Sequence, residues 1–121
     1  MRKSVLSVAI FSLLLALALV NACGKDLRIT VTDAGITLTW SAPTTYTDGS
    51  PLLVAGYRVY YGSAARSYNG SIDIKTNSIT LDSAALFSGV SATYYFAVTA
   101  YDAAATESDY SNEVNTYISF K

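Results

Sequence analysis

The stretch Tyr94-Tyr95-Phe96-Ala97-Val98-Thr99-Ala100 is the longest β-like segment of the sequence, and it decides the fold class. β-Branched and aromatic residues dominate it, as they do in strands. Side chains alternate between the two faces of a strand, which sends Tyr94, Phe96 and Val98 to one face. Six shorter segments of the same character are separated by turn residues; they span 27–31, 36–40, 57–61, 71–74, 79–81 and 114–120. Seven short strands within residues 27–121 predict an all-β antiparallel sandwich.

The inward positions of these strands are rich in aromatic residues. Alternation turns Tyr57, Val59 and Tyr61 inward, and segment 36–40 ends in the single tryptophan of the chain, Trp40. Each aromatic side chain buries on the order of 150–250 Å², so a domain of this size can form a sufficient core without disulfides. The expected core markers are Trp40, Tyr57, Tyr61, Tyr94, Phe96 and Val98.

The order of these residues resembles a fibronectin type III domain over about Leu27–Tyr117. The resemblance rests on Trp40 followed by Ser41-Ala42-Pro43, on the segments that begin at Tyr57 and Tyr94, and on Ser111-Asn112-Glu113-Val114. It implies an immunoglobulin-like sandwich with Trp40 as the core tryptophan of the second strand and Tyr94 as the tyrosine-corner residue. Leu86, Gly89 and Tyr94 are spaced more widely than in the family, which predicts a longer loop or an irregular corner.

Residues 1–22 have the pattern of a secretory signal peptide. Arg2 and Lys3 precede an apolar run, Val5–Val20, that only two serines interrupt. Asn21 ends the run before it reaches the roughly 20 apolar residues that a membrane-spanning helix needs. An uncleaved anchor is the alternative interpretation.

The stretch Val20-Asn21-Ala22-Cys23-Gly24 resembles a bacterial lipobox, with an aliphatic residue three positions before the only cysteine of the chain and a small residue just before it. The resemblance implies cleavage before Cys23 and acylation of that residue with chains such as palmitate; two or three chains make a lasting membrane anchor. Because Gly24 is not Asp, it also implies the outer membrane in an organism that has one. The alternative is a lone buried cysteine behind an ordinary signal peptide. Residues 23–26 then form a short lipidated tether, and 27–121 form the domain.

Composition narrows the functional classes. The absence of His and the single Cys rule out Ser-His-Asp triads, Cys-His dyads and Cys/His zinc sites. The mature chain from Cys23 has six basic and nine acidic residues, a net charge of −3, and its basic residues are scattered. Nucleic-acid binding needs clustered Lys and Arg, so we do not expect it. We expect no cofactor and no enzymatic activity.

Four carboxylates lie close together in the sequence: Asp102, Glu107, Asp109 and Glu113. Calcium needs six to eight oxygen ligands, but this spacing matches no calcium-binding loop. An acid–base pair for glycoside cleavage needs two carboxylates that face a cleft, and a small sandwich offers no evident one. The segment is expected to be a solvated polar loop without a metal.

Ten tyrosines are the conspicuous excess of the composition. Alternation sends Arg58, Tyr60 and Tyr95 outward on strands that are neighbours in the family, and Tyr117 lies on the next strand. Exposed aromatic residues bind proteins as interface anchors or stack on sugars. The other interpretation is cross-strand pairs that only stabilise the sheet.

Two functional classes therefore stay open. The first is a lipid-anchored scaffolding module that binds another protein of the cell envelope, which the short tether favours because it keeps the domain at the membrane. The second is a carbohydrate-binding module that uses the exposed tyrosines.

Overall fold

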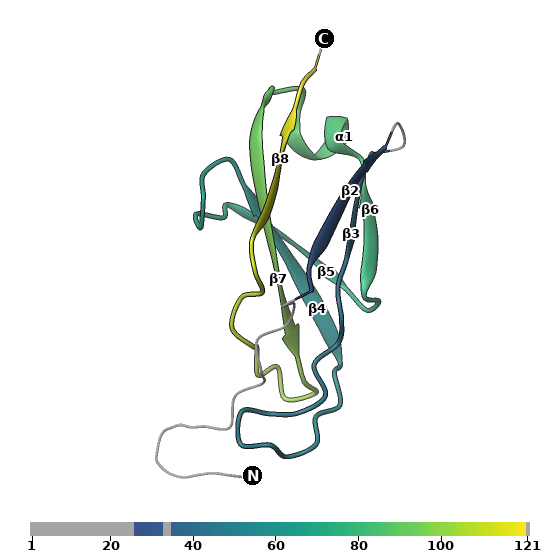
Figure 1. Cartoon of the computed structure of the whole chain (residues 1–121), viewed down its shortest axis with the longest axis vertical. Coiled ribbons are helices and arrows are strands. Elements are labelled where there is room, and N and C mark those ends of the chain that lie inside the picture. Colours follow the sequence, from purple (N-terminus) through teal and green to yellow (C-terminus); the bar gives the residue numbers. More distant parts are fainter. Residues whose placement is uncertain (1–25, 33–34, 121) are drawn as a thin grey trace.

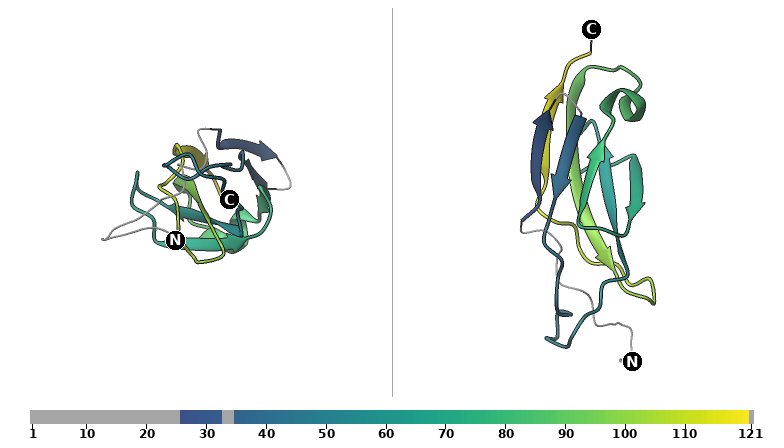
Figure 2. Two further views of the ribbon diagram at one scale, coloured as in Figure 1. Left: turned by 90° about the horizontal axis from the view of Figure 1, so that it is seen from below. Right: turned by 90° about the vertical axis from the view of Figure 1, so that its right-hand side faces the viewer.

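The computed structural model describes residues 26–32 and 35–120 as a sandwich of two antiparallel sheets (Figures 1 and 2). The first sheet has the order β2-β3-β6 and the second has the order β5-β4-β7-β8. Their bounds are β2 Arg28–Thr32, β3 Gly35–Thr39, β4 Gly56–Gly62, β5 Gly70–Ile74, β6 Ser78–Leu81, β7 Ala92–Tyr101 and β8 Val114–Ile118. All seven predicted strands are present, and the predicted fold class is confirmed.

The strand ends differ from the sequence-based ranges by one or two residues. Trp40 follows β3 and does not belong to it, and β8 ends at Ile118 where Phe120 was predicted. The predicted signal peptide and Cys23 lie outside the described residues. Within the part of the chain that the structure describes, no helix is long and apolar enough to cross a membrane.

The core lies between the two sheets. Ile36 and Leu38 of β3 are fully buried, as are Val59 of β4 and the inward residues Phe96 and Val98 of β7. Trp40 packs edge-on against Tyr57, with ring centroids 5.4 Å apart, and so joins the end of one sheet to the other. Tyr94 is also buried, whereas Tyr61 is half-buried at the edge of this cluster.

A short helix, α1 (Ser83–Phe87), was not predicted from the sequence. Asp82 caps its first turn by accepting hydrogen bonds from the N–H groups of Ala84 and Ala85. The helix buries Phe87, whose ring stacks on Tyr94 with a centroid distance of 3.7 Å. The helix ends at Phe87, and residues 88–91 connect it to the start of β7.

The tyrosine-corner bond forms in spite of the wide spacing between Leu86 and Tyr94. The Tyr94 hydroxyl donates a hydrogen bond of 2.5 Å to the Val90 carbonyl, four residues upstream. Ser88 and Gly89 have positive φ angles and turn the chain between α1 and Val90. The predicted departure from the family is therefore a different turn before the corner.

Two serines supply hydrogen-bond acceptors to the part of β7 that does not pair with β8. β8 pairs only with residues Ala92–Phe96 of β7. Beyond them, the Ser111 hydroxyl accepts a hydrogen bond from the Val98 N–H, and the Ser108 hydroxyl accepts one from the Ala100 N–H, each at 2.9 Å. The segment 102–113 is thereby held against the second half of β7, at the edge of the second sheet.

Candidate functional site

The strand register brings the four predicted face residues to the outer side of the four-stranded sheet. Arg58 lies opposite Thr99 on β7, and Tyr60 lies opposite Ala97. Tyr95 lies opposite Gly62, and Tyr117 of β8 lies opposite Thr93 of β7. Directly opposed residues share a face of an antiparallel sheet. We call this side of the β5-β4-β7-β8 sheet the outer face.

Tyr60 is not a free aromatic platform, contrary to expectation. It is half-buried, and its ring contacts Tyr110 edge-to-face at a centroid distance of 5.1 Å and Tyr68 at 6.1 Å. Tyr68 and Tyr110 also contact each other at 5.2 Å. We call Tyr60, Tyr68 and Tyr110 the tyrosine cluster. Sequence reasoning missed Tyr68 and Tyr110, because both lie in irregular segments that alternation does not describe.

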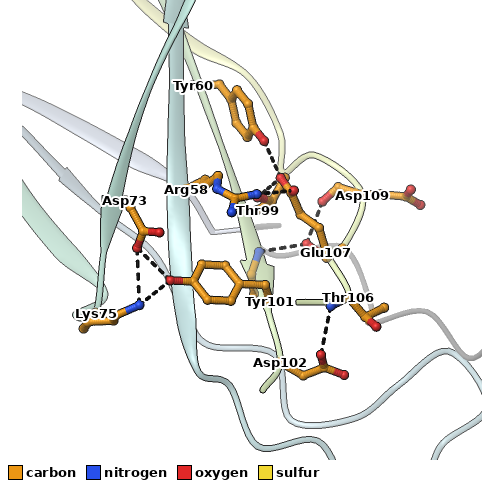
Figure 3. A network of polar contacts seen from close by, with 12 residues as sticks. Arg58, Tyr60, Asp73, Lys75, Thr99, Tyr101, Asp102, Thr106, Glu107 and Asp109 are labelled. Carbon is orange, nitrogen blue, oxygen red and sulfur yellow. Dashed lines mark hydrogen bonds and ion pairs between the residues drawn. The ribbon is translucent and has the colours of Figure 1, made fainter. Parts of the chain in front are cut away.

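Glu107 holds the centre of the outer face (Figure 3). Its carboxylate accepts hydrogen bonds from Arg58 Nη1 at 2.7 Å, from Thr99 Oγ1 at 2.6 Å and from the Tyr60 hydroxyl. Partial burial raises the pKa of Glu107, but the bonds from Thr99 and Tyr60 and the positive charge of Arg58 outweigh it and lower the pKa below its ordinary value. Burial and the bond to Glu107 raise the pKa of Tyr60.

A second group of charges surrounds Tyr101, which is buried at the end of β7 (Figure 3). Its hydroxyl donates to Asp73 at 2.7 Å and accepts from Lys75. The hydrogen bond from Tyr101 lowers the pKa of Asp73. Arg58 and Lys75 both lie over the Tyr101 ring, at 5.2 and 4.9 Å from its centroid. Arg58 therefore connects the Glu107 contacts with those of Tyr101.

The four clustered carboxylates are not a simple solvated loop, which corrects the prediction. Asp102 is buried and accepts hydrogen bonds from the N–H groups of Ala104 and Thr106 and from the Tyr46 hydroxyl. Glu113 accepts from the Arg66 N–H at 2.8 Å and from the Tyr68 hydroxyl. Of the four, only Asp109 makes no side-chain hydrogen bond or ion pair with the described residues, and it is exposed.

Three of these carboxylates, those of Asp102, Glu107 and Glu113, make their contacts at separate places in the fold. Among the residues that the structure describes, no group of three or more His, Cys, Asp or Glu side chains is placed to hold a metal ion. Burial and the bond to Glu113 raise the pKa of Tyr68. The carboxylates therefore hold tyrosine hydroxyls and loop N–H groups in place, and so give the outer face a defined shape.

Two aromatic side chains of the outer face are exposed. Tyr117 is 64% exposed and Tyr110 is 48% exposed, whereas Tyr95 is half-buried. The Tyr110 ring packs against Tyr60 and Tyr68, so these contacts define its position although about half of its surface is exposed to solvent. The arrangement offers a partner rigid aromatic surface beside polar groups that are already hydrogen-bonded.

No family model matches the chain, and no curated protein matches it in sequence. Solved structures do. The sixth fibronectin type III domain from human fibronectin type III domain containing protein 3 superimposes with a TM-score of 0.62 and 18% identity, covering 84% of this chain and 88% of that one. The Clostridium perfringens spore cortex lytic enzyme SleM superimposes with a TM-score of 0.52 and 18% sequence identity, and the match covers 83% of this chain and 28% of the enzyme. The fold is thus that of a fibronectin type III domain.

Proposed function

We propose that this protein is a lipid-anchored, non-enzymatic scaffolding module of a bacterial cell envelope. It binds another envelope protein through the outer face, and the observation that carries this proposal is the pair of exposed tyrosines, Tyr110 and Tyr117. Tyrosine presents a large surface and loses little conformational entropy on binding. The network beneath Tyr110 orders the surface in advance, which lowers the cost of association.

The anchor is supported by the sequence around Cys23. Its place directly behind the apolar run is that of a lipidated cysteine, and Gly24 favours the outer membrane where the cell has one. Replacing Cys23 by Ser removes the acylated sulfur, so we expect the Cys23→Ser protein to leave the membrane pellet on cell fractionation. A Ser variant that stays as firmly in the pellet as the unchanged protein would show that the apolar run is an uncleaved anchor.

The binding surface is tested by photo-crosslinking in cells. A photoreactive residue in place of Tyr110 or Tyr117 should give a discrete crosslinked product with one envelope protein. The matched control is position Val31, which is also exposed but lies on β2 of the other sheet. If a photoreactive residue at position 31 gives the same crosslinked product in the same yield, the proposal is contradicted.

Carbohydrate binding is the second candidate, and the exposure of Tyr117 favours it. Sugars stack on free ring faces, but the Tyr60 ring is already in contact with two other tyrosines, which leaves Tyr95 and Tyr117 for this role. Retention of the domain on peptidoglycan or another insoluble polysaccharide, lost in Tyr117→Ser and kept in Val31→Ser, would replace protein binding as the assigned function.

A further inference from the structure

The chain enters the domain at a fixed point beside the loop that connects β3 to β4. The Leu27 N–H donates to Asn112 Oδ1, and the Leu27 carbonyl accepts from Asn112 Nδ2, each at 3.1 Å. The next residue, Arg28, pairs with Thr39 at the end of β3. Two residues after Thr39 the chain leaves the sheet as residues 41–55, which we call the 41–55 loop.

The 41–55 loop projects beyond this attachment point. Figures 1 and 2 show it at the end of the domain opposite α1 and the end of β8, extending past the start of β2. Its shape is held by backbone hydrogen bonds, Leu52 N to Thr44 O at 3.0 Å and Tyr46 N to Ser50 O at 2.9 Å. The Tyr46 hydroxyl bonds to the buried Asp102 at 2.6 Å and ties the loop to the domain.

The tether between Cys23 and the domain is short. Only Gly24 and Lys25 separate Cys23 from Asp26, the first described residue. At about 3.3–3.6 Å per residue, the chain from Cys23 to Leu27 reaches roughly 14 Å at most. Because the loop projects past Leu27, where this tether joins the domain, a bilayer that holds the lipid of Cys23 lies at the same end of the domain as the loop.

We infer that the 41–55 loop rests on the bilayer and inserts Leu53 at the boundary of headgroups and acyl chains. The inference rests on the proposed lipidation of Cys23. Leu53 is 88% exposed, the most exposed large apolar side chain in the described part of the molecule, while its neighbours Leu52 and Val54 are partly buried. The bilayer would remove from water a side chain that the fold itself leaves exposed.

The contact is apolar in character. The loop contains no Lys or Arg, and its single carboxylate, Asp48, accepts hydrogen bonds from the N–H and hydroxyl of Ser50. The contact is therefore insensitive to salt and needs no anionic lipid. One leucine suffices because the lipid anchor makes the contact intramolecular, at a high effective concentration. This orientation directs α1 and the end of β8 away from the membrane.

The test uses the mature, lipidated chain in phosphatidylcholine vesicles. When Cys23 is acylated, a cysteine at Thr47 in the loop is the only free thiol, and it carries an environment-sensitive fluorophore while Leu53 stays intact. The control site is Val90→Cys, beside α1 at the other end. We expect the probe at 47 to be quenched by lipid-borne nitroxides roughly two-fold or more strongly than the probe at 90. Adding Leu53→Ser should remove that difference, and 0.5 M salt should not.

The outcomes separate the two proposals. Equal quenching at 47 and 90, in protein that floats with the vesicles, overturns the orientation and leaves the lipid anchor standing. Quenching at 47 that Leu53→Ser does not reduce assigns the contact to another residue and overturns the role of Leu53. A chain that carries no lipid and does not float overturns both proposals.

Discussion

Glu107 is the residue on which most of the outer face depends, because one carboxylate accepts hydrogen bonds from three side chains of two strands. Replacing Glu107 by Gln keeps the size of the side chain but removes the negative charge to which Arg58, Tyr60 and Thr99 donate hydrogen bonds. Hydrogen bonds to charged groups contribute more to stability than hydrogen bonds between neutral groups. Partial solvent exposure, however, weakens the ion pair between Arg58 and Glu107. The position therefore contributes modestly to stability and strongly to the local order of the face.

We predict that Glu107→Gln lowers the free energy of unfolding by about 1 kcal/mol at pH 7. The folded pKa of Glu107 lies below its ordinary value, so its contribution is complete above about pH 5 and is lost as the pH falls through the folded pKa. Urea denaturation of both proteins at pH 7 and at about pH 3 should show the difference shrinking in acid. Asp109→Asn, which removes an exposed charge two residues away, is the control and should be near neutral.

The contribution of the tyrosine corner to stability can be measured by removing one hydroxyl, that of Tyr94. The side chain is only 6% exposed, and its ring stays packed on Phe87 when the hydroxyl is removed. We predict that Tyr94→Phe loses about 1 kcal/mol, the net value of one hydrogen bond to Val90. Tyr95→Phe on the same strand has no such bond to lose within the described residues and should be neutral in the same denaturation experiment. Equal losses for the two variants would mean that the corner bond contributes nothing.

At the scale of the element, β7 is stabilised differently along its two halves. Its first half has β8 as a regular partner, whereas its second half relies on Ser108 and Ser111, whose hydroxyls replace the missing backbone acceptors. The N–H groups of Val98 and Ala100 lie in fully buried residues. A buried N–H without a partner costs about 1–3 kcal/mol, so the two serines are structural requirements of the segment 102–113.

We predict that Ser111→Ala lowers the free energy of unfolding by about 1–3 kcal/mol through the orphaned Val98 N–H. Amide hydrogen exchange gives a specific readout, because the Val98 amide should lose protection while the paired first half of β7 keeps it. Ser71→Ala on β5, at an exposed position, is the matched control. Unchanged exchange at Val98 in the Ser111→Ala protein would contradict the role of that hydroxyl.

At the scale of the whole molecule, Trp40 couples the two sheets. It is buried, follows β3 of one sheet and packs on Tyr57 of the other. Its indole Nε1 has no hydrogen-bond partner among the described residues, so its contribution comes from packing alone. We predict that Trp40→Ala lowers the free energy of unfolding by about 3–5 kcal/mol through a large cavity.

That loss is a large part of a total stability of roughly 5–15 kcal/mol for a domain, and it should appear as one cooperative shift of the denaturation curve. Trp40→Phe keeps an aromatic ring and loses no hydrogen bond, so it should cost less, roughly 1–2 kcal/mol. If Phe and Ala at position 40 destabilise equally, the indole NH has a partner after all and packing does not explain the residue.

The sequence by itself determined the two-sheet architecture and the inward side chains, because both follow from a local rule. Alternation in a strand needs only neighbouring residues, and each of the seven strands carries it within four to ten residues. Tyr57, Val59, Phe96 and Val98 are buried for this reason. The tyrosine corner could be predicted from the resemblance to a known family, because Tyr94 lies near the start of the matching strand. Helix α1 was not predictable, because five residues are too short to show a helical period.

Only the tertiary structure decided which outward side chains are free. Glu107 lies 47 residues from Tyr60, and Glu113 lies 45 residues from Tyr68, so no local pattern couples them. Strand register placed Arg58 and Tyr60 on the outer face, but the segment 102–113 then folded back along β7 and partly covered Tyr60 with Tyr110. The outward half of an alternating strand is exposed only where no other segment packs on it, and that depends on how distant parts of the chain meet. For this reason the exposed aromatic residues in the described part of the chain are Tyr110 and Tyr117, whereas Tyr60 is half-buried in the tyrosine cluster.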